Sequence, residues 1–171
     1  MKKEHGCHWV AGIEIEPKAA SKARGKVDEL YEGSIEEMIL PIEDGSLDAV
    51  LCPDVLEHLV DPWSVVAKLS RLIKSGGYFV LSVPNVRHFK VLWPLITQGK
   101  WEYQEFGILD RTHLRFFTKD TAVKLVDGMR VEAIECTGLA PGTRASLLNR
   151  LTFGLFRPFF EFQYIITARK L

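Results

Sequence analysis

The sequence predicts an α/β fold built around a mostly parallel β-sheet. Segments with the pattern of strands alternate with segments with the pattern of helices along the chain, which is typical of this fold class. Residues 47–52 form a continuous apolar run of the kind that is buried on both faces of a parallel sheet. The length of 171 residues and the hydrophobic content of 47% suit one domain with a sizeable core. We therefore expect a single domain over residues 1–171.

The first part of the chain contains three predicted strands and one helix. Residues 9–15 are predicted to form a buried strand that ends in acidic residues. Glu16 and Pro17 begin a helix, because proline loses no hydrogen bond at the first helical position. Residues 27–31 form a short second strand, and the apolar run described above forms the third.

A second helix follows, and its start is marked by Asp61 as N-cap and by Pro62 in the first turn. Apolar residues then recur at the spacing of one buried helical face: Val65, Val66, Leu69, Leu72 and Ile73. Gly76 and Gly77 are expected to end this helix, and residues 78–83 to form the next strand.

The C-terminal half begins with an aromatic-rich insert over residues 84–118 that interrupts the alternation. Residues 118–126 then predict a helix, and residues 130–136 and 162–170 predict two closing strands. An apolar helical segment, residues 147–160, lies between these strands. The long connection indicates an antiparallel C-terminal strand at the edge of the sheet.

Charge and hydropathy exclude several classes of function. The 22 basic residues balance the 22 acidic ones, so the chain lacks the basic surface typical of nucleic-acid binding and a polybasic membrane anchor. It contains no run of about 20 apolar residues that could span a membrane. No apolar signal-peptide core follows the N-terminus, so we expect a cytoplasmic protein.

The cysteines and the N-terminal histidines predict no metal site and no thiol chemistry. Cys7, Cys52 and Cys136 follow no disulfide or zinc spacing. His5, Cys7 and His8 lie close in sequence but match no standard zinc pattern. Cys52 ends a buried strand, where thiols are usually inert.

The expected ligand site lies at the carboxyl ends of the parallel strands. Three stretches fall there: residues 14–16, 52–58 and 82–88. An acid at the end of a strand can accept both hydroxyls of a ribose, and Glu14 fits this role, with Glu16 as the competing candidate. A solvated acid without a ligand is the alternative interpretation.

Four pieces of the sequence stand in a characteristic order: "VAGIEIEPKAA", "EGSIEEMILPIEDGSLDAVLCPDVLEHLVDPW", "LIKSGGYFVLSVPNVRH" and "GILDRTHLRFFT". This order and spacing resembles the class I S-adenosylmethionine-dependent methyltransferases, and among them a small bacterial group with a "DRTHLRFFT" motif. The resemblance extends from Val10 to about Lys170. It implies a Rossmann-like methyltransferase fold, S-adenosylmethionine as the cofactor and S-adenosylhomocysteine as the product.

The resemblance also implies residues that hold the adenosine part of the cofactor. Glu14 would accept the ribose hydroxyls, and Ile15 would pack on the adenine ring. Ser34 and Ile35 would lie at the far edge of the adenine. Many relatives have aspartate at the position of Ser34, which leaves a contact with the adenine amino group open.

At the methionine end of the cofactor, the resemblance implies four residues after the third strand. Pro53 and Asp54 would line this end through their backbone, and Leu56 and His58 would close the side. A hydrogen bond from His58 to a neighbouring carbonyl is the structural alternative.

The chain departs from the family pattern at its start. The family's first strand and its glycine-rich Asp-x-Gly-x-Gly turn precede the region that begins here at Trp9, and this chain has neither. The difference is about 30 residues, or one strand–helix unit. We expect the strands that carry Glu14 and Cys52 to lack the neighbour between them. A truncation, direct closure of the gap and a homodimer through exposed central strands are the alternatives.

Methyl transfer requires alignment of donor and acceptor and exclusion of water, and a hydroxyl acceptor also benefits from a base. Residues 84–118 are the expected lid on the acceptor side. His88 and His113 are the candidate bases, with Asp110 as their orienting partner or as an alternative base. A buried polar network that only anchors the lid is the competing interpretation.

The sequence therefore predicts an S-adenosylmethionine-dependent O-methyltransferase for a small molecule, a sugar or a lipid-linked precursor. The alternative is a non-catalytic remnant that serves as an interaction or structural domain without cofactor. Residues 147–160 could contact lipid as an interfacial helix, but we favour a helix that packs between the last two strands.

Overall fold

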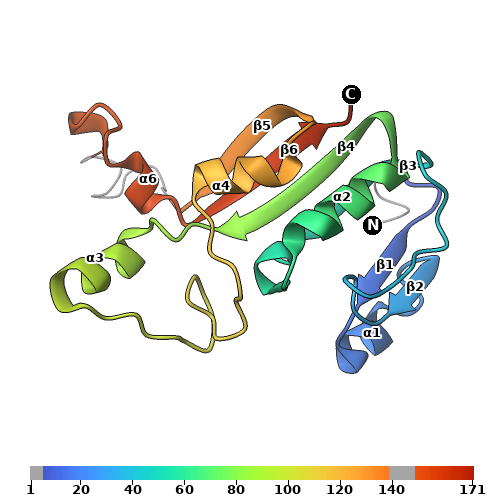
Figure 1. The fold of residues 1–171 in the computed structure, drawn as a ribbon, viewed down its shortest axis with the longest axis horizontal. Coiled ribbons are helices and arrows are strands. Elements are labelled where there is room, and N and C mark those ends of the chain that lie inside the picture. Colours follow the sequence, from blue (N-terminus) through green and yellow to red (C-terminus); the bar gives the residue numbers. More distant parts are fainter. Residues whose placement is uncertain (1–5, 139–148) are drawn as a thin grey trace. The chain divides into compact units, whose positions relative to one another are not determined.

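The computed structural model describes residues 6–138 and 149–171. The chain forms two compact units, Met1–Ile42 and Glu43–Leu171, each with its own β-sheet (Figure 1). His5 and the first two residues of the helix predicted over 147–160 lie outside the described residues.

The first unit is a strand–helix–strand motif. It consists of β1 (Ala11–Glu14), α1 (Pro17–Ala23) and β2 (Glu29–Glu32), and the two strands are parallel. The helix begins where the sequence predicts, because the Glu16 carboxylate accepts two backbone N–H groups of the first turn, at 3.0 and 2.6 Å. Such a cap satisfies donors that have no partner inside the helix.

The second unit contains a four-stranded mixed sheet. Its strands are β3 (Leu47–Pro53), β4 (Ile73–Pro84), β5 (Arg130–Thr137) and β6 (Gln163–Arg169), in the order β3-β4-β6-β5. β3 and β4 are parallel, and β6 is antiparallel to both of its neighbours. The predicted α/β fold and the antiparallel C-terminal strand are thus present, and that strand, β6, lies between β4 and β5.

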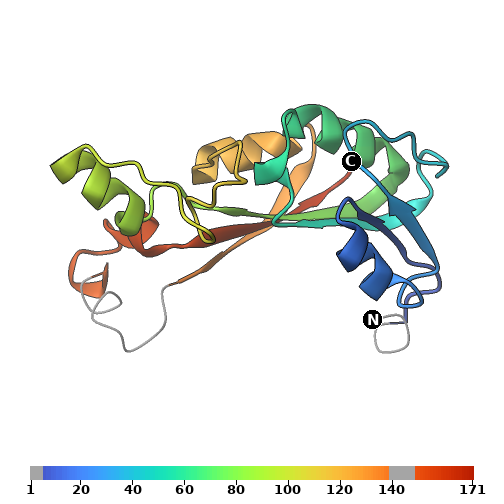
Figure 2. The same cartoon turned by 90° about the horizontal axis from the view of Figure 1, so that it is seen from below.

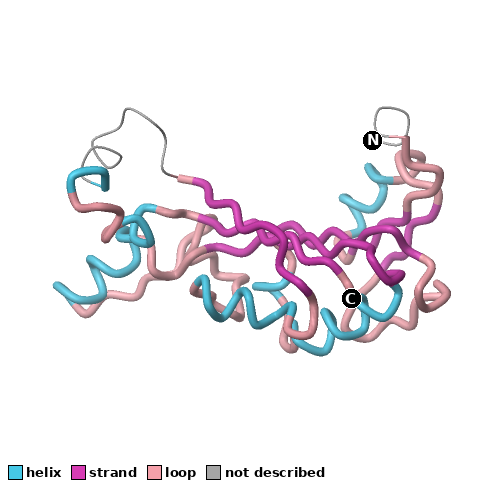
Figure 3. The backbone as a smooth tube through the Cα atoms, turned by 90° about the horizontal axis from the view of Figure 1, so that it is seen from above, coloured by secondary structure: helices cyan, strands magenta, loops and turns pink. Residues whose placement is uncertain are grey.

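The core of this unit lies between the sheet and two helical segments on one of its faces. Figures 2 and 3 show α2 (Pro62–Leu72) and α4 (Lys119–Val123), which continues into η2 (Lys124–Val126), on the same side of the strands. The two central strands contribute alternate, nearly inaccessible side chains to the core: Phe79, Leu81, Val83, Tyr164, Ile166 and Ala168. Within the described part of the chain, no helix combines the length and apolar character needed to cross a membrane.

The junction between α2 and β4 differs from the prediction. The helix ends at Leu72 and the strand begins directly at Ile73, although the sequence placed this boundary at the glycine pair. Gly77 is required for a different reason. A Cβ at this position would lie 2.8 Å from the Asp48 carbonyl oxygen and 2.6 Å from Ile73 Cγ2, so glycine permits the close approach of β3 and β4.

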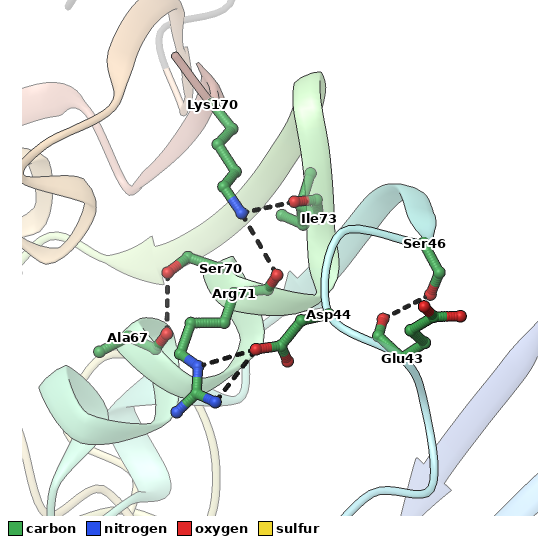
Figure 4. A network of polar contacts seen from close by, with 8 residues as sticks. All are labelled: Glu43, Asp44, Ser46, Ala67, Ser70, Arg71, Ile73 and Lys170. Carbon is green, nitrogen blue, oxygen red and sulfur yellow. Dashed lines mark hydrogen bonds and ion pairs between the residues drawn. The ribbon is translucent and has the colours of Figure 1, made fainter.

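A polar network holds this junction in place (Figure 4). The Lys170 ammonium donates to the carbonyl oxygens of Arg71 and Ile73, at 3.2 and 2.6 Å. Arg71 in turn pairs with Asp44 at 3.0 Å. Lys170, the residue directly after β6, thereby donates to carbonyls at the helix end, which have no partner inside the helix.

Two segments carry many exposed apolar side chains. The predicted insert contains α3 (Phe89–Gln98), and the connection between the last strands contains α6 (Arg157–Phe160). No residue of α6 is buried, and the preceding residues Leu151, Phe153 and Leu155 are at least 69% exposed. These described residues therefore do not form the packed helix that the sequence favoured.

Candidate functional site

The carboxyl end of β3 is connected to its neighbours by the side chain of Asp54. The Ser82 hydroxyl donates to Asp54 Oδ1 at 2.9 Å, and the Gln163 amide donates to the same oxygen. Asp54 has a φ of 50°, a left-handed conformation that non-glycine residues adopt rarely and that often marks functional turns. Pro53 and Asp54, both predicted at the methionine end of the cofactor, are exposed at this turn.

Directly after the turn, the short 3-10 helix η1 (Leu56–His58) contacts the segment that contains the "DRTHLRFF" residues. Leu56 is fully buried, and Glu57 is only 1% exposed. The Glu57 carbonyl accepts the N–H groups of Leu114 and Arg115, at 2.8 and 3.0 Å. Residues more than fifty positions apart are thus joined through their main chains.

The Glu57 side chain is an unusual buried acid. Neither of its carboxylate oxygens has a hydrogen-bond partner among the described residues. Burial, assisted by the negative charge of Asp54, raises the pKa of Glu57 to about 8. A buried carboxylate without a partner is costly, so this side chain calls for a functional explanation.

Two histidines lie beside this carboxylate. The rings of His58 and His113 meet edge to face, with centroids 4.7 Å apart and an interplanar angle of 75°. His113 Nδ1 lies 3.0 Å from the carbonyl oxygen of Ile108. Because a carbonyl can only accept, Nδ1 carries the proton and Nε2 keeps its lone pair.

The other histidine is oriented in the same way. His58 Nδ1 lies 3.3 Å from the carbonyl oxygen and 3.0 Å from the hydroxyl of Thr112. That hydroxyl donates to Asp110 Oδ1 at 2.6 Å, and this bond, with a second from the Thr112 backbone N–H, holds the pKa of Asp110 below its usual value. The chain Asp110–Thr112–His58 therefore also leaves the Nε2 lone pair of His58 available.

Three side chains consequently converge: Glu57, His58 and His113 each offer one ligand atom, and these atoms lie within 4.8 Å of one another. Both histidines were predicted as site residues from the sequence, His58 for the cofactor and His113 as a base. Glu57 was missed. The available signal was the Glu-His pair directly after a strand end, but burial of the carboxylate depends on a distant segment.

The remaining candidate base, His88, has a structural role in its surroundings. It is 5% exposed and caps α3, where its Nδ1 accepts the Lys90 N–H at 3.3 Å. Its ring packs against Phe89 and Phe162. Burial and the charge of Lys90 lower the pKa of His88. An imidazole that accepts at Nδ1 carries its proton on Nε2, which makes His88 a poor base at that atom.

In the first unit, the structure distinguishes the two candidate acids. Both Glu16 oxygens accept backbone N–H groups of α1. Glu14, the last residue of β1, uses Oε1 to accept the N–H of Glu16 at 2.9 Å. Ile15 follows with an exposed side chain, whereas Ser34 and Ile35 are half-buried after β2. Glu14 is therefore the acid with an oxygen left for a ligand among the described contacts.

Comparison with known proteins supports the predicted family. A family model for methyltransferase domains matches residues 2–81. The chain is 39% identical over 114 residues to a ubiquinone biosynthesis O-methyltransferase from Thiobacillus denitrificans, which covers 57% of the chain and 48% of that relative. A protein of the same name from Cupriavidus pinatubonensis is 26% identical over 135 residues, or 76% of the chain and 54% of the relative. The chain thus spans about half the length of these relatives.

Solved structures share the fold. A S-adenosylmethionine-dependent methyltransferase from Archaeoglobus fulgidus matches with a TM-score of 0.71, covering 99% of this chain and 79% of its own. The identity of 22% makes this a likeness of fold. A methyltransferase from Mesorhizobium loti matches with a TM-score of 0.64 at 16% identity, over 98% of this chain and 83% of its own. The chain therefore has the fold of S-adenosylmethionine-dependent methyltransferases, and its residues 2–81 match the methyltransferase domain model.

Proposed function

We propose that this chain takes part in S-adenosylmethionine-dependent O-methylation of a small molecule that carries a hydroxyl group. The observation that carries the proposal is the pair of imidazoles, His58 and His113, whose Nδ1 protons are committed to main-chain carbonyls. They lie beyond the carboxyl end of β3, where α/β folds bind ligands. The names of the relatives, which are O-methyltransferases, agree with this reaction class.

The chemistry follows from the nature of the methyl donor. The acceptor oxygen attacks the sulfonium methyl carbon in line, and the carbon–sulfur electron pair returns to sulfur. When bound, S-adenosylmethionine supplies this activated methyl group. A hydroxyl becomes a better nucleophile when its proton is removed, and an Nε2 lone pair of His58 or His113 is placed to receive it. Asp110 acts on His58 through Thr112, as a positioning residue.

The cofactor contacts are proposed residue by residue. Glu14 accepts the ribose hydroxyls, since its backbone-bound Oε1 fixes the carboxylate and leaves the second oxygen for the ligand. The exposed side chain of Ile15 packs on the adenine, with Ser34 and Ile35 at the adenine edge.

The methionine part of the cofactor is assigned to residues at and after the end of β3. Its proposed contacts are Pro53 and Asp54, at the exposed turn after β3, and Leu56 and His58 in η1. The fixed position of Asp54, bonded to Ser82 at 2.9 Å, supports a preorganised backbone at this end.

The acceptor side is assigned to residues 84–118, which form the proposed lid.

Contact with an apolar or lipid-linked acceptor is supported by the exposed side chains of Leu151, Phe153 and Leu155. A homodimer through β3 is supported by its position at the end of the strand order.

Calorimetric titration of the 171-residue chain with S-adenosylhomocysteine tests the cofactor assignment. We expect saturable binding that Glu14→Gln weakens by at least about tenfold, since a charge-assisted bond to a hydroxyl contributes roughly 1.5–3 kcal/mol. Glu37→Gln is the matched control, because Glu37 is exposed on the same unit and is expected to leave binding unchanged.

Absence of binding by a chain whose circular dichroism shows it to be folded would favour the non-catalytic alternative for this polypeptide. Equal binding by the wild-type chain and the Glu14→Gln variant would reject the ribose assignment and retain the cofactor.

A further inference from the structure

We propose that Glu57, His58 and His113 bind a divalent transition-metal ion, which holds the oxygen of the methyl acceptor. This proposal rests on the proposed O-methylation for the role of the metal, but the binding site itself stands on geometry. The three ligand atoms lie within 4.8 Å of one another, and they come from η1 and from the docked segment over residues 110–117.

The buried carboxylate of Glu57 favours a bound cation. Glu57 is 1% exposed, and both of its oxygens lack a hydrogen-bond partner among the described residues. A buried charge is tolerated when it is paired or when it coordinates a metal. A cation between Glu57 and the two imidazoles would displace the carboxyl proton and pair with the resulting carboxylate, which would explain why this buried side chain is an acid.

The two histidines are oriented as metal ligands usually are. A metal-binding histidine usually donates its other ring N–H to a carbonyl or a carboxylate, which fixes its tautomer. His113 donates Nδ1–H to the Ile108 carbonyl, and His58 donates Nδ1–H to Thr112, whose hydroxyl is bonded to Asp110. Both Nε2 atoms therefore carry lone pairs.

The combination of side chains in the cluster also suits a metal ion. Two imidazoles and one carboxylate form a typical catalytic site for zinc and for other first-row divalent ions. Tetrahedral ligands at about 2.1 Å from a metal lie about 3.4 Å apart, so ligand atoms within 4.8 Å of one another would have to approach by up to about 1.4 Å to bind one ion. Three protein ligands leave at least one coordination position open for an exogenous oxygen.

The open position defines a role for the metal in methyl transfer. A bound divalent metal lowers the pKa of a coordinated hydroxyl group. The acceptor O–H then loses its proton to water, and the metal-bound oxyanion forms the new O–C bond. The S–C bond breaks with its electron pair remaining on sulfur, which yields S-adenosylhomocysteine. In the metal-bound state the imidazoles act as ligands, and the metal replaces them in activating the hydroxyl.

The experiment is a titration of the metal-free 171-residue chain with Co²⁺, followed by visible absorption, and with Zn²⁺, followed by calorimetry. We expect one equivalent to bind with the absorption of a nitrogen- and oxygen-ligated cobalt site. Glu57→Gln and His113→Asn should each weaken binding by at least about tenfold, and Thr112→Val, which loosens His58, by about tenfold. His58→Gln removes the third ligand and should weaken binding in the same way. Because His58 is exposed, this variant carries little risk to folding.

Two control variants keep the result specific. Glu102→Gln and His8→Gln remove an acid and an imidazole at exposed positions outside the cluster, and they should bind Co²⁺ as the wild-type chain does. A folded chain that binds no Co²⁺ or Zn²⁺ would overturn the proposal. Binding that is unchanged in the ligand variants would do the same.

Titration of the same samples with S-adenosylhomocysteine separates the two hypotheses. Metal binding without S-adenosylhomocysteine binding rejects the proposed methyl transfer by this chain and retains the metal site. The reverse result rejects the metal site and leaves the histidines as bases. Selective binding of Mg²⁺ over Zn²⁺ would also contradict the proposal, because Mg²⁺ prefers oxygen ligands.

Discussion

At the scale of single residues, burial determines which side chains of this protein can react. Cys52, the last residue but one of β3, has 5% of its surface exposed, and burial raises the pKa of its thiol to about 12. Cys7 is exposed in contrast. Since the thiolate is the reactive form, these two cysteines should differ strongly in reactivity, and Cys52 should not act as a nucleophile.

We predict that iodoacetamide at pH 8 modifies Cys7 rapidly and Cys52 at least about a thousandfold more slowly. A pKa raised from 9.0 to about 12 lowers the thiolate fraction by about a factor of 1000, and limited access adds to the effect. Mass spectrometry of timed samples measures both rates, and protein unfolded in urea should lose the difference. Equal labelling in the folded protein would show that the Cys52 thiol is accessible to solvent and would contradict its burial.

At the scale of elements, the candidate site depends on the docking of residues 110–117 against η1. Two main-chain hydrogen bonds reach the Glu57 carbonyl. Arg115 adds a side-chain contact, because its guanidinium donates to the Val60 carbonyl and lies 5.7 Å from the ring centre of Trp63. These contacts hold His113 beside η1, so their loss should disturb the cluster without removing any of its members.

We predict that Arg115→Ala lowers the free energy of unfolding by about 1–2 kcal/mol, through the loss of a charged hydrogen bond and a cation–π contact. It should also speed hydrogen exchange at the Leu114 amide. Chemical denaturation and hydrogen exchange with mass spectrometry measure the two effects.

Arg111→Ala serves as the control for this prediction. Arg111 forms an exposed pair with Glu105 in the same segment, and such pairs contribute about 0–1 kcal/mol. Equal destabilisation by the two variants, or unchanged exchange at Leu114 in Arg115→Ala, would mean that Arg115 does not anchor the segment.

At the scale of the whole molecule, the strand order places β3 at one edge of the four-stranded sheet. In the described part of the chain, β3 is hydrogen-bonded only to β4. Its Leu51 side chain is 65% exposed. Open strand edges with exposed apolar residues promote pairing with another chain, which supports the proposed homodimer.

We predict that the chain self-associates with increasing concentration and that Leu51→Lys shifts the balance towards the monomer. A charge on an edge strand opposes strand pairing. Sedimentation velocity over a range of concentrations measures the effect, with Ile39→Lys as a control, because Ile39 is 93% exposed and lies outside the strands. A wild-type chain that stays monomeric throughout would reject the homodimer.

The succession of strands and helices along the chain could be predicted from sequence, because apolar runs and N-cap residues are local signals. The start of β4 could not be predicted. Gly77 suggested the end of a helix, but glycine is needed there because a Cβ would collide with the Asp48 carbonyl of the neighbouring strand, and this contact is visible only in the tertiary structure. The choice between Glu14 and Glu16 likewise depended on which carboxylate caps α1. In the sequence, Glu57 looks like any acid in a helical turn, because its burial depends on the distant residues 110–117.

The main-chain bonds that fasten residues 110–117 have a consequence for how the protein can evolve. Leu114 contributes its N–H to the Glu57 carbonyl while its side chain is 51% exposed. A backbone donor is retained in every residue type except proline. With residues 84–118 in their proposed role on the acceptor side, mutations of exposed side chains here would change the surface offered to the acceptor and leave the main-chain attachment intact, so new substrate preferences would arise one substitution at a time.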